Sequence, residues 1–399
     1  MTKKIKNSPQ IRFNGFTDAW KQRKLGEIAD RYDNLRIPIT ASKRIKGTIP
    51  YFGANGIQDY VEGYTHEGEF ILIAEDGAND IRNYPVHYVS GKVWVNNHAH
   101  VIKAIADISD NRYLMNFIKQ MNLVPFLVGG GRAKLNSETM MKLKIKLPSY
   151  NEQVKIGSFF KQLDDTIALH QRKYDLLIKM KKSYLQKMFP KKGESKPEIR
   201  FSGFTDAWEQ RKLGEVINGQ YNGQTPSRAK ASFWNGDINW LSSGELNRGT
   251  VTTTIEKITE QGKKNANLKM VPRDTFVLAI TGLEAAGTRG NCAILGIDTT
   301  LNQSCMALFP DEKLLDSSFL FHWYRKVGEE YGLQYTQGTK QQSYNAELIK
   351  ILPIVLPSVK EQLAISSFLS KLDDTIALHQ RELNSLKTLK KSLLQKMFV

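Results

Sequence analysis

The sequence contains only two cysteines, Cys292 and Cys305, among 399 residues. Two cysteines are too few for a disulfide framework or a zinc cluster, so we expect a reduced pair of small core residues. No stretch approaches 18 consecutive apolar residues, and the basic start of the chain is not followed by an apolar run. The sequence therefore predicts neither a membrane span nor a signal peptide, and it favours a cytoplasmic protein.

Motifs for nucleotide binding and catalysis are also missing. There is no Gly-x-x-x-x-Gly-Lys-Ser/Thr loop to cradle ATP, and no Asn/Asp-Pro-Pro-aromatic tetrapeptide of an adenine methyltransferase. His98 and His100 stand two apart on a predicted strand and could suit a metal, but no third ligand is identifiable, so hydrogen-bonded roles are favoured. We expect no catalytic residue, metal or cofactor in this chain.

Acidic residues are scarce relative to basic ones. The chain has 57 Lys and Arg against 40 Asp and Glu, a formal net charge of +17. Such a balance is typical of proteins whose partner is a polyanion. Nucleic acid is the first interpretation, and an acidic protein face is the second.

The strongest positive signal is an internal repeat. The decapeptide LDDTIALHQR occurs at 163–172 and again, unchanged, at 372–381. Its flanks match as well, because residues 147–189 and 356–398 agree at 27 of 43 positions without a gap. The chain is therefore two tandem copies of one plan.

A second repeated block opens each half, IRFNGFTDAWKQRKLGE at 11–27 and IRFSGFTDAWEQRKLGE at 199–215. The segments between the blocks, 28–146 and 216–355, resemble each other only in outline. Both contain short apolar runs closed by turns, such as the Asn55-Gly56 hairpin signal, followed by a helical pattern. We expect each to be a compact α+β domain with a different surface.

The repeated tails have apolar residues at spacings of three and four, which predicts long amphipathic helices. At 1.5 Å per residue, such a helix is a rod of roughly 55 Å, and the other copy offers a partner for its apolar stripe. An approximate twofold relation between like halves would make the pair antiparallel.

The predicted fold class is α+β, in two tandem pseudo-symmetric halves. Each half is a mixed α/β domain followed by a long helix, and the two helices pack antiparallel as a coiled-coil spacer. The expected boundaries are a first domain at 1–149, a first spacer helix at 150–189, a linker at 190–198, a second domain at 199–358 and a second spacer helix at 359–399.

The polar loops 129–136 and 338–345 lie at equivalent places in the two halves and are candidates for reading DNA bases, and polar segments elsewhere in the two domains are further candidates. Arginine suits guanine edges, and Gln or Asn suits adenine. Ordinary surface turns are the alternative for each loop. The predicted DNA-binding residues are Asn97, His98, Arg132, Lys134, Ser227, Arg228, Arg289, Asn302, Gln303, Lys340, Gln341, Gln342 and Ser343.

Together these features resemble the specificity subunits of type I restriction-modification enzymes. LPSYNEQVKI and LPSVKEQLAI are similar to the Leu-Pro-x-x-x-Glu-Gln start of that family's long helices. QTPSRAKASFWNGDINWLSSGEL with GTKQQSYNAELIKILPIVLP looks like one common type of its target recognition domain, and YFGANGIQDYV with KVWVNNHAHVI looks like another. The resemblance covers nearly the whole chain. The segments 28–146 and 216–355, however, correspond to the part of the family that varies, so they do not indicate which bases are recognised.

The resemblance implies that each domain reads one half of a bipartite, asymmetric sequence in double-stranded DNA, while the helices dock two modification (methyltransferase) subunits. S-adenosylmethionine would then belong to those subunits, and ATP and Mg²⁺ to the restriction (motor and nuclease) subunits. The alternatives are a chain that itself cleaves or methylates DNA, and a coiled-coil scaffold without DNA readout. The polar residues predicted to bind partner subunits are Asp164, Asp165, Gln171, Arg172, Asp373, Asp374, Gln380 and Arg381.

Overall fold

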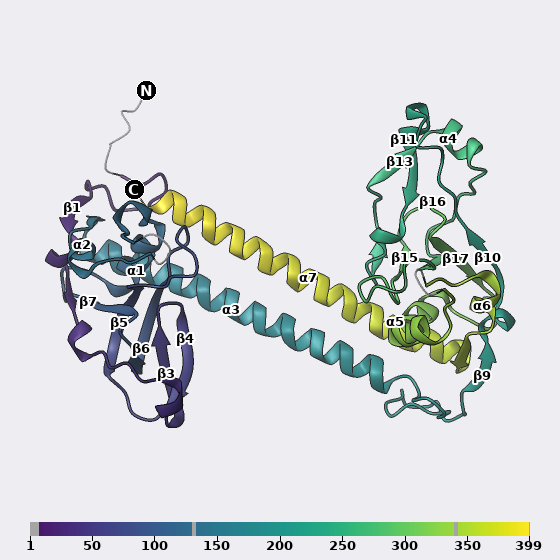
Figure 1. The fold of residues 1–399 in the computed structure, drawn as a ribbon, viewed down its shortest axis with the longest axis horizontal. Coiled ribbons are helices and arrows are strands. Elements are labelled where there is room, and N and C mark those ends of the chain that lie inside the picture. The colour runs from purple at the N-terminus through teal and green to yellow at the C-terminus, as the bar shows by residue number, and fades with distance from the viewer. Residues whose placement is uncertain (1–7, 130–132, 339–341, 399) are drawn as a thin grey trace. The chain divides into compact units, whose positions relative to one another are not determined.

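The computed structural model describes residues 8–129, 133–338 and 342–398. The chain forms two compact units, one from residues 1–172 with 381–399 and the other from residues 173–380 (Figure 1). Each unit therefore contains a globular part and a portion of both long helices. No helix in the described part of the chain is long and apolar enough to cross a membrane.

The first unit is built on a six-stranded sheet with the order β2-β7-β5-β6-β3-β4. Neighbouring strands are antiparallel except β3 and β6, which are parallel. A separate two-stranded sheet joins β1 to β8. The elements are β1 (Lys21–Lys24), β2 (Ala29–Arg31), β3 (Lys46–Gly53), β4 (Gly56–Val61), β5 (His66–Ala74), β6 (Val86–Val95), β7 (Ala99–Ala104), α1 (Asn111–Gln120), α2 (Ser137–Met141) and β8 (Lys144–Leu147).

Strand β5 lies in the middle of this sheet and is buried on both faces. Ile71 and Ile73 join the core beneath α1, whereas Phe70 and Leu72 join a smaller cluster on the other face. This division follows from the alternation of side chains along a strand. Helix α1 is started by Asp110, whose carboxylate accepts a hydrogen bond from the third helical N–H.

The second unit has the same repeated segments as the first, but its sheets are different. A five-stranded sheet has the order β10-β17-β14-β15-β12, a three-stranded sheet has the order β13-β11-β16, and β9 pairs with β18. The elements are β9 (Glu209–Lys212), β10 (Ile217–Asn222), β11 (Trp234–Leu241), β12 (Thr250–Val251), β13 (Glu256–Ile258), α4 (Glu260–Asn265), β14 (Phe276–Ala279), β15 (Cys292–Leu295), β16 (Thr300–Leu301), β17 (Cys305–Pro310), α5 (Ser317–Gln334), α6 (Ala346–Lys350) and β18 (Pro353–Leu356).

Several local predictions are confirmed. Strands β3 and β4 form a hairpin that turns at Ala54 and Asn55, and Gly56 has a φ of +106°, which an L side chain rarely adopts. Cys292 and Cys305 are unpaired and buried, and burial raises the pKa of the Cys292 thiol to about 12. The thiols are therefore inert core groups at neutral pH.

The long helices are α3 (Tyr150–Lys187) and α7 (Val359–Met397). A buried ion pair fixes the first turn of each. Arg12 donates two hydrogen bonds of 2.7 Å to Glu152, and Arg200 donates two of 2.7 Å to Glu361. Such a two-pronged pair is geometrically specific, so the same Arg–Glu lock joins the start of each half to its long helix.

The glutamine after each of these glutamates joins the helix to the globular domain by hydrogen bonds. The Gln153 amide donates to the carbonyls of Ile108 and Pro148 and accepts from the N–H of Asp110. Gln362 makes the equivalent bonds to Leu314, Pro357 and Asp316. The Leu-Pro-x-x-x-Glu-Gln pattern is thus a structural joint in which every polar group has a partner.

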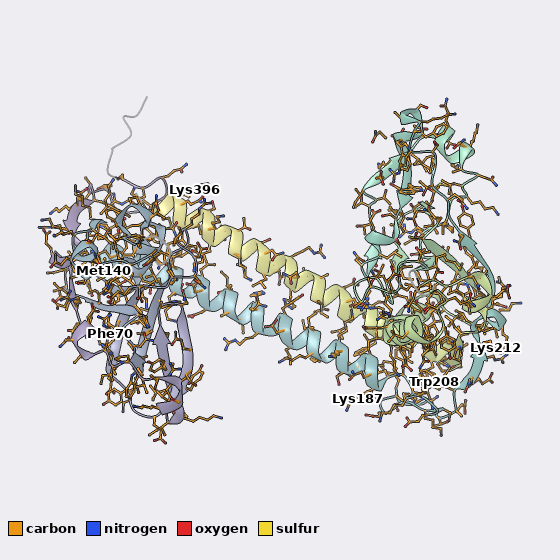
Figure 2. The ribbon with its side chains drawn as sticks, viewed as in Figure 1. Phe70, Met140, Lys187, Trp208, Lys212 and Lys396 are labelled. Atoms are coloured by element: carbon orange, nitrogen blue, oxygen red, sulfur yellow. The ribbon has the colours of Figure 1, made fainter. Side chains whose placement is uncertain are left out.

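Each core is completed by the end of the helix that begins in the other half of the sequence. Leu394 and Met397, at the end of α7, are buried in the core of the first unit. Met188 and Phe189, which follow α3, are buried in the core of the second unit beside Trp208. Figure 2 shows the two helix ends at Lys396 and Lys187. The carbonyls of these lysines accept the N–H groups of Ile11 and Ile199, respectively.

This closure predicts a large effect of Phe189→Ala. The ring is 2% exposed and packs on Phe319 and Trp208, so its removal should lower the free energy of unfolding of the second unit by about 3–5 kcal/mol. Urea titration followed by tryptophan fluorescence measures the change. Leu176→Ala, which alters an exposed residue of α3, should stay within about 0.5 kcal/mol of the parent. Equal losses in both variants would contradict this account of the closure.

Candidate nucleic-acid interface

In the first unit, the predicted residues Asn97, His98 and Lys134 lie close together. Asn97 and His98 form the turn between β6 and β7, and the segment after β5 lies beside it, with the Glu75 N–H donating to the His98 carbonyl at 2.8 Å. The His98 Nδ1 lies 2.5 Å from an oxygen of Asp76, and Lys134 lies 3.0 Å from Glu75. The turn and Lys134 are thus brought together where β5 ends.

An ionic cluster beneath these loops holds them in place. His100 Nδ1 lies 2.8 Å from Asp33, and its Nε2 lies 2.7 Å from the carbonyl of Leu135. The Arg36 guanidinium donates to Glu75 at 2.7 Å. Asp33, Glu75 and His100 have ligand atoms close enough to suit a metal. However, Arg36 and Lys134 already supply the positive charge, and the arrangement fits an ion-pair cluster.

The carboxylates of this cluster are held ionised. Burial alone would favour the neutral form of Asp33, but hydrogen bonds from His100 and from the N–H of Val101 outweigh it, so the pKa of Asp33 is below its ordinary value. For Glu75, hydrogen bonds from Arg36 and Lys134 outweigh burial in the same way and lower the pKa. The hydrogen-bonded roles favoured for His98 and His100 fit this geometry, in which their carboxylate partners are Asp76 and Asp33, respectively.

In the second unit, Ser227 and Arg228 lie against β11. Arg228 makes an ion pair with Glu256 and stacks 3.7 Å above the ring of Trp234. The Trp234 Nε1 donates to the Ser227 carbonyl at 3.2 Å. Arg228 is therefore held in one orientation, with its side chain still 55% exposed.

Asn302 and Gln303 lie in a turn that contacts the segment before Ser227. Asn222 donates to the Gln303 carbonyl at 3.1 Å, and Thr225 hydrogen-bonds to the Gln303 side chain. Asn302 is buried, and its side chain accepts from the N–H of Ser304 at 3.1 Å. Asn302 therefore shapes this turn, and Gln303 anchors the neighbouring loop.

Arg289 and Gln342 meet through two loops that pair with each other. The Arg289 guanidinium donates to the carbonyls of Leu283 and Glu284, both at 2.9 Å. The Gln342 N–H donates to the Glu284 carboxylate, and the Gln342 carbonyl accepts from the N–H of Leu283. Ser343 forms a bridge with Thr281. These predicted residues therefore lie close together, but the hydrogen bonds of the Arg289 guanidinium stabilise the loop to which it belongs.

Three predicted base-reading residues, Arg132, Lys340 and Gln341, lie outside the described residues. Sequence reasoning missed Asp33, Arg36 and Glu75, which come together from distant segments without a local motif. It also missed Glu256 and Trp234, which orient Arg228. An arginine six residues before Trp234 was a weak signal for that stack.

The residues predicted for partner binding lie along the long helices. In the first unit, Asp164 pairs with Lys390. In the second, Asp373 pairs with Lys181 and accepts from Arg325 of α5 at 2.6 Å. These two carboxylates are thus engaged within the chain, and reversing their charge would disturb the helix pair itself. As the residue number rises on α3 it falls on α7, so the paired segments run antiparallel in each unit.

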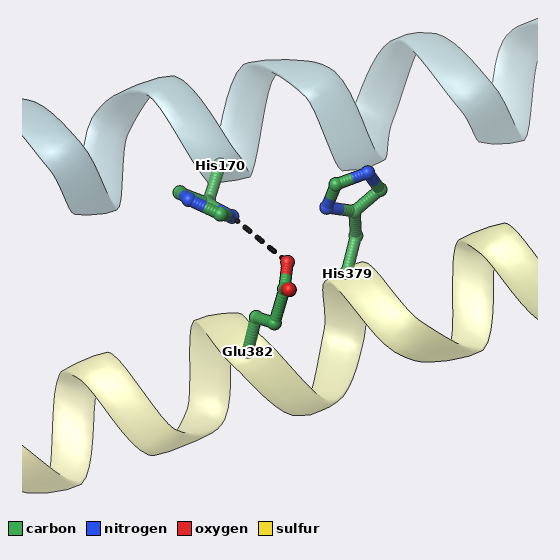
Figure 3. A group of neighbouring side chains, drawn as sticks. All are labelled: His170, His379 and Glu382. Carbon is green, nitrogen blue, oxygen red and sulfur yellow. Dashed lines mark ion pairs between the residues drawn. The ribbon is translucent and has the colours of Figure 1, made fainter.

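The remaining polar residues of the repeat are placed differently. His170 lies 3.4 Å from Glu382 (Figure 3), and Gln171 accepts from Lys387 at 3.2 Å. Asp165 pairs with Lys161 one turn away on its own helix at 2.5 Å. All eight residues remain predictions for partner contact, and Asp165, Arg172, Asp374 and Arg381 are the exposed ones.

The ionic cluster predicts that Asp33→Asn weakens the first unit at pH 7, by about 1–3 kcal/mol. Because the folded-state pKa of Asp33 is lowered from 3.8, its contribution is fully present above that value and is lost as the pH falls through the folded-state pKa. The difference between parent and variant should therefore shrink between pH 5 and the acid limit of folding. Urea midpoints measured across this range test it, and a difference that does not change with pH would refute the assignment.

The comparisons with known proteins agree with this architecture. The family described as the type I restriction modification DNA specificity domain matches twice, at residues 17–178 and 205–388. A putative type I restriction enzyme specificity subunit of Haemophilus influenzae, S.HindORF215P, is 33% identical over 368 residues, covering 89% of this chain and 87% of that protein. The EcoR124I/EcoR124II specificity subunit of Escherichia coli is 25% identical, covering 82% of this chain and 80% of that protein.

Solved structures share the fold. The type I S subunit from M. genitalium superposes with a TM-score of 0.69 at 14% identity, covering 98% of this chain and 99% of that one. The two matched domains, the curated relative and the repeated frame lead to one conclusion. The chain belongs to the family of type I restriction-modification specificity subunits, which provide DNA recognition and not catalysis.

Proposed function

We propose that this chain reads a bipartite, asymmetric site in double-stranded DNA, one half with each recognition domain. The observation that carries the proposal is that the two domains share one frame but differ in the part that would face DNA. The Arg–Glu lock and the glutamine joint are the same in both. The sheets and loops differ, as reading two unlike half-sites requires.

The proposed DNA-binding residues of the first domain are Asn97, His98, Arg132 and Lys134. In the second domain they are Ser227, Arg228, Arg289, Asn302, Gln303, Lys340, Gln341, Gln342 and Ser343. Within these sets, residues with exposed side chains are better candidates for base contacts than residues that are buried or bonded to their own loop. Buried Asn302 and the loop-bound Arg289 would instead position their neighbours.

We further propose that the helices dock two modification subunits, which would carry S-adenosylmethionine, and that restriction subunits with ATP and Mg²⁺ join them. A chain from a structure of a type I R-M system, solved to explain complex assembly, has this fold with a TM-score of 0.50. Leu169 and Leu378 occupy the same position of the repeat and are 60% and 50% exposed. Exposed leucines at equivalent places suit one partner surface used twice.

Action on DNA would place the complex in the cytoplasm.

Exchanging residues 28–146 for the corresponding segment of another specificity subunit tests modular recognition. The frame contacts at Arg12 and Glu152 would remain, so the hybrid should fold, and one half of the methylated sequence should change while the other half stays. Sequencing of methylated adenines, in cells that express the hybrid with its modification subunit, measures the outcome. A change in both halves, or in neither, would refute the proposal.

The docking surface predicts that the double variant Leu169→Asp, Leu378→Asp assembles poorly with modification subunits. A carboxylate buried at each interface would cost several kcal/mol, so co-purification should fall at least tenfold while binding of the free chain to duplex DNA is retained. Leu333→Asp is a matched control, because Leu333 is 60% exposed on α5. Undiminished assembly of the double variant would exclude these leucines from the interface.

A further inference from the structure

The first unit contains a pocket of about 1080 Å³ with basic walls. Three segments line it: the loop before β6, the end of α1 and the last third of α7. They contribute Arg82 from the loop, Lys119 from α1, and Lys387, Lys390 and Lys391 from α7. Five cations that come from distant parts of the sequence therefore surround one concave surface.

Most of this positive charge is not neutralised. Within the described residues, Lys390 is the one cation of the five that has a carboxylate at ion-pair distance, Asp164. Lys387 instead bonds to the neutral side chain of Gln171. Burial of the Lys119 ammonium and, to a smaller extent, the charge of Lys390 lower the pKa of Lys119, and the charge of Asp164 only partly opposes them. The pocket thus has surplus positive charge, which an anion would relieve.

Helix dipoles do not account for the cluster. Cations near a helix C-terminus are stabilised by the dipole, and Lys119 is in the last turn of α1. Lys387 and Lys391 stand ten and six residues before Met397, the end of α7. The dipole effect falls off within the last turn, so it does not favour them. Their placement calls for another partner.

We infer that this pocket binds the sugar-phosphate backbone of duplex DNA, as a sequence-independent contact next to the base-reading loops of the first unit. The inference rests on the proposed DNA-reading function. The pocket lies next to the predicted DNA-reading residues, because Tyr84, which lines it, donates a hydrogen bond of 3.0 Å to the carbonyl of Ala74, and Glu75 and Asp76 follow Ala74 directly.

An acidic protein face is the competing occupant. Protein interfaces are depleted in lysine and enriched in aromatic residues, whereas phosphate contacts are made mainly by Lys and Arg. Three lysines and an arginine without carboxylate partners therefore favour DNA. The exposed leucines of the spacer have the opposite character and suit a protein partner.

The repeat supplies matched variants for the test. Lys387 and Lys391 correspond, 209 positions earlier, to Ile178 and Lys182 of the second unit. Lys387→Ile thus introduces the residue that the other copy already holds, and it should not disturb folding. The test variant combines Lys387→Ile, Lys391→Gln and Arg82→Gln. Lys182→Gln is the control, because it removes the equivalent charge outside the pocket.

The measurement is binding of the full chain to a fluorescent 30-base-pair duplex of random sequence, titrated at several salt concentrations. Each lost phosphate contact should reduce the slope of log K against log salt by about 0.9, so the triple variant should show a slope smaller by about 2 to 3. The methylated sequence should stay the same, since backbone contacts do not read bases. The control should lose at most one such step.

Two results would overturn the inference. A triple variant with the slope of the control would show that the pocket does not contact phosphates. An unchanged slope with loss of co-purifying modification subunits would assign the pocket to an acidic protein. Failure of the proposed function looks different, because the parent chain with its modification subunits would then show no preference for any duplex sequence.

Discussion

The core of each globular unit includes side chains from the end of a long helix that begins in the other half of the sequence, and each unit depends on this packing. Met188 and Phe189 complete the second core, and Leu394 and Met397 complete the first. Each of these side chains is almost fully buried, and such burial stabilises by about 1.5–3 kcal/mol per residue. Neither half can therefore be cut out at the linker without removing part of a core.

The closure explains which parts of the sequence are repeated and which are not. The repeated segments make contacts that need particular residues: Arg12 with Glu152, Arg200 with Glu361, and the glutamine after each glutamate. A buried charge that loses its partner costs several kcal/mol, so these positions tolerate little change. The segments between the repeated blocks need only pack an apolar face against them. Their sheets and loops can therefore differ, and they do.

Local features of the fold could be predicted from the sequence, and long-range ones could not. The hairpin at Asn55 and Gly56 and the long helices follow from turn chemistry and periodicity, which act over a few residues. The parallel pairing of β3 with β6, in contrast, depends on how the whole sheet is packed. No pattern in the sequence indicates that order.

The same limit applies to the candidate interface. The residue types indicated separate surface loops, and the structure brings His98 and Lys134 together beside Asp76 and Glu75. Their roles depend on partners that are distant in sequence. Arg228 is oriented by Glu256, and Arg289 binds the carbonyls of its own loop. A basic residue in a polar loop thus indicates a candidate binding surface. Whether its side chain can reach a ligand depends on the groups to which it is hydrogen-bonded within the protein.

The repeated decapeptide is constrained on two faces at once. Its first aspartate faces the opposite helix, where Asp164 pairs with Lys390 and Asp373 with Lys181. Its second leucine, at positions 169 and 378, is exposed in both copies. An exposed leucine contributes nothing to the spacer, so pairing of the helices alone would not retain it in both copies. Identity at all ten positions is what a segment would show if it held the spacer together on one face and met the same partner twice on the other.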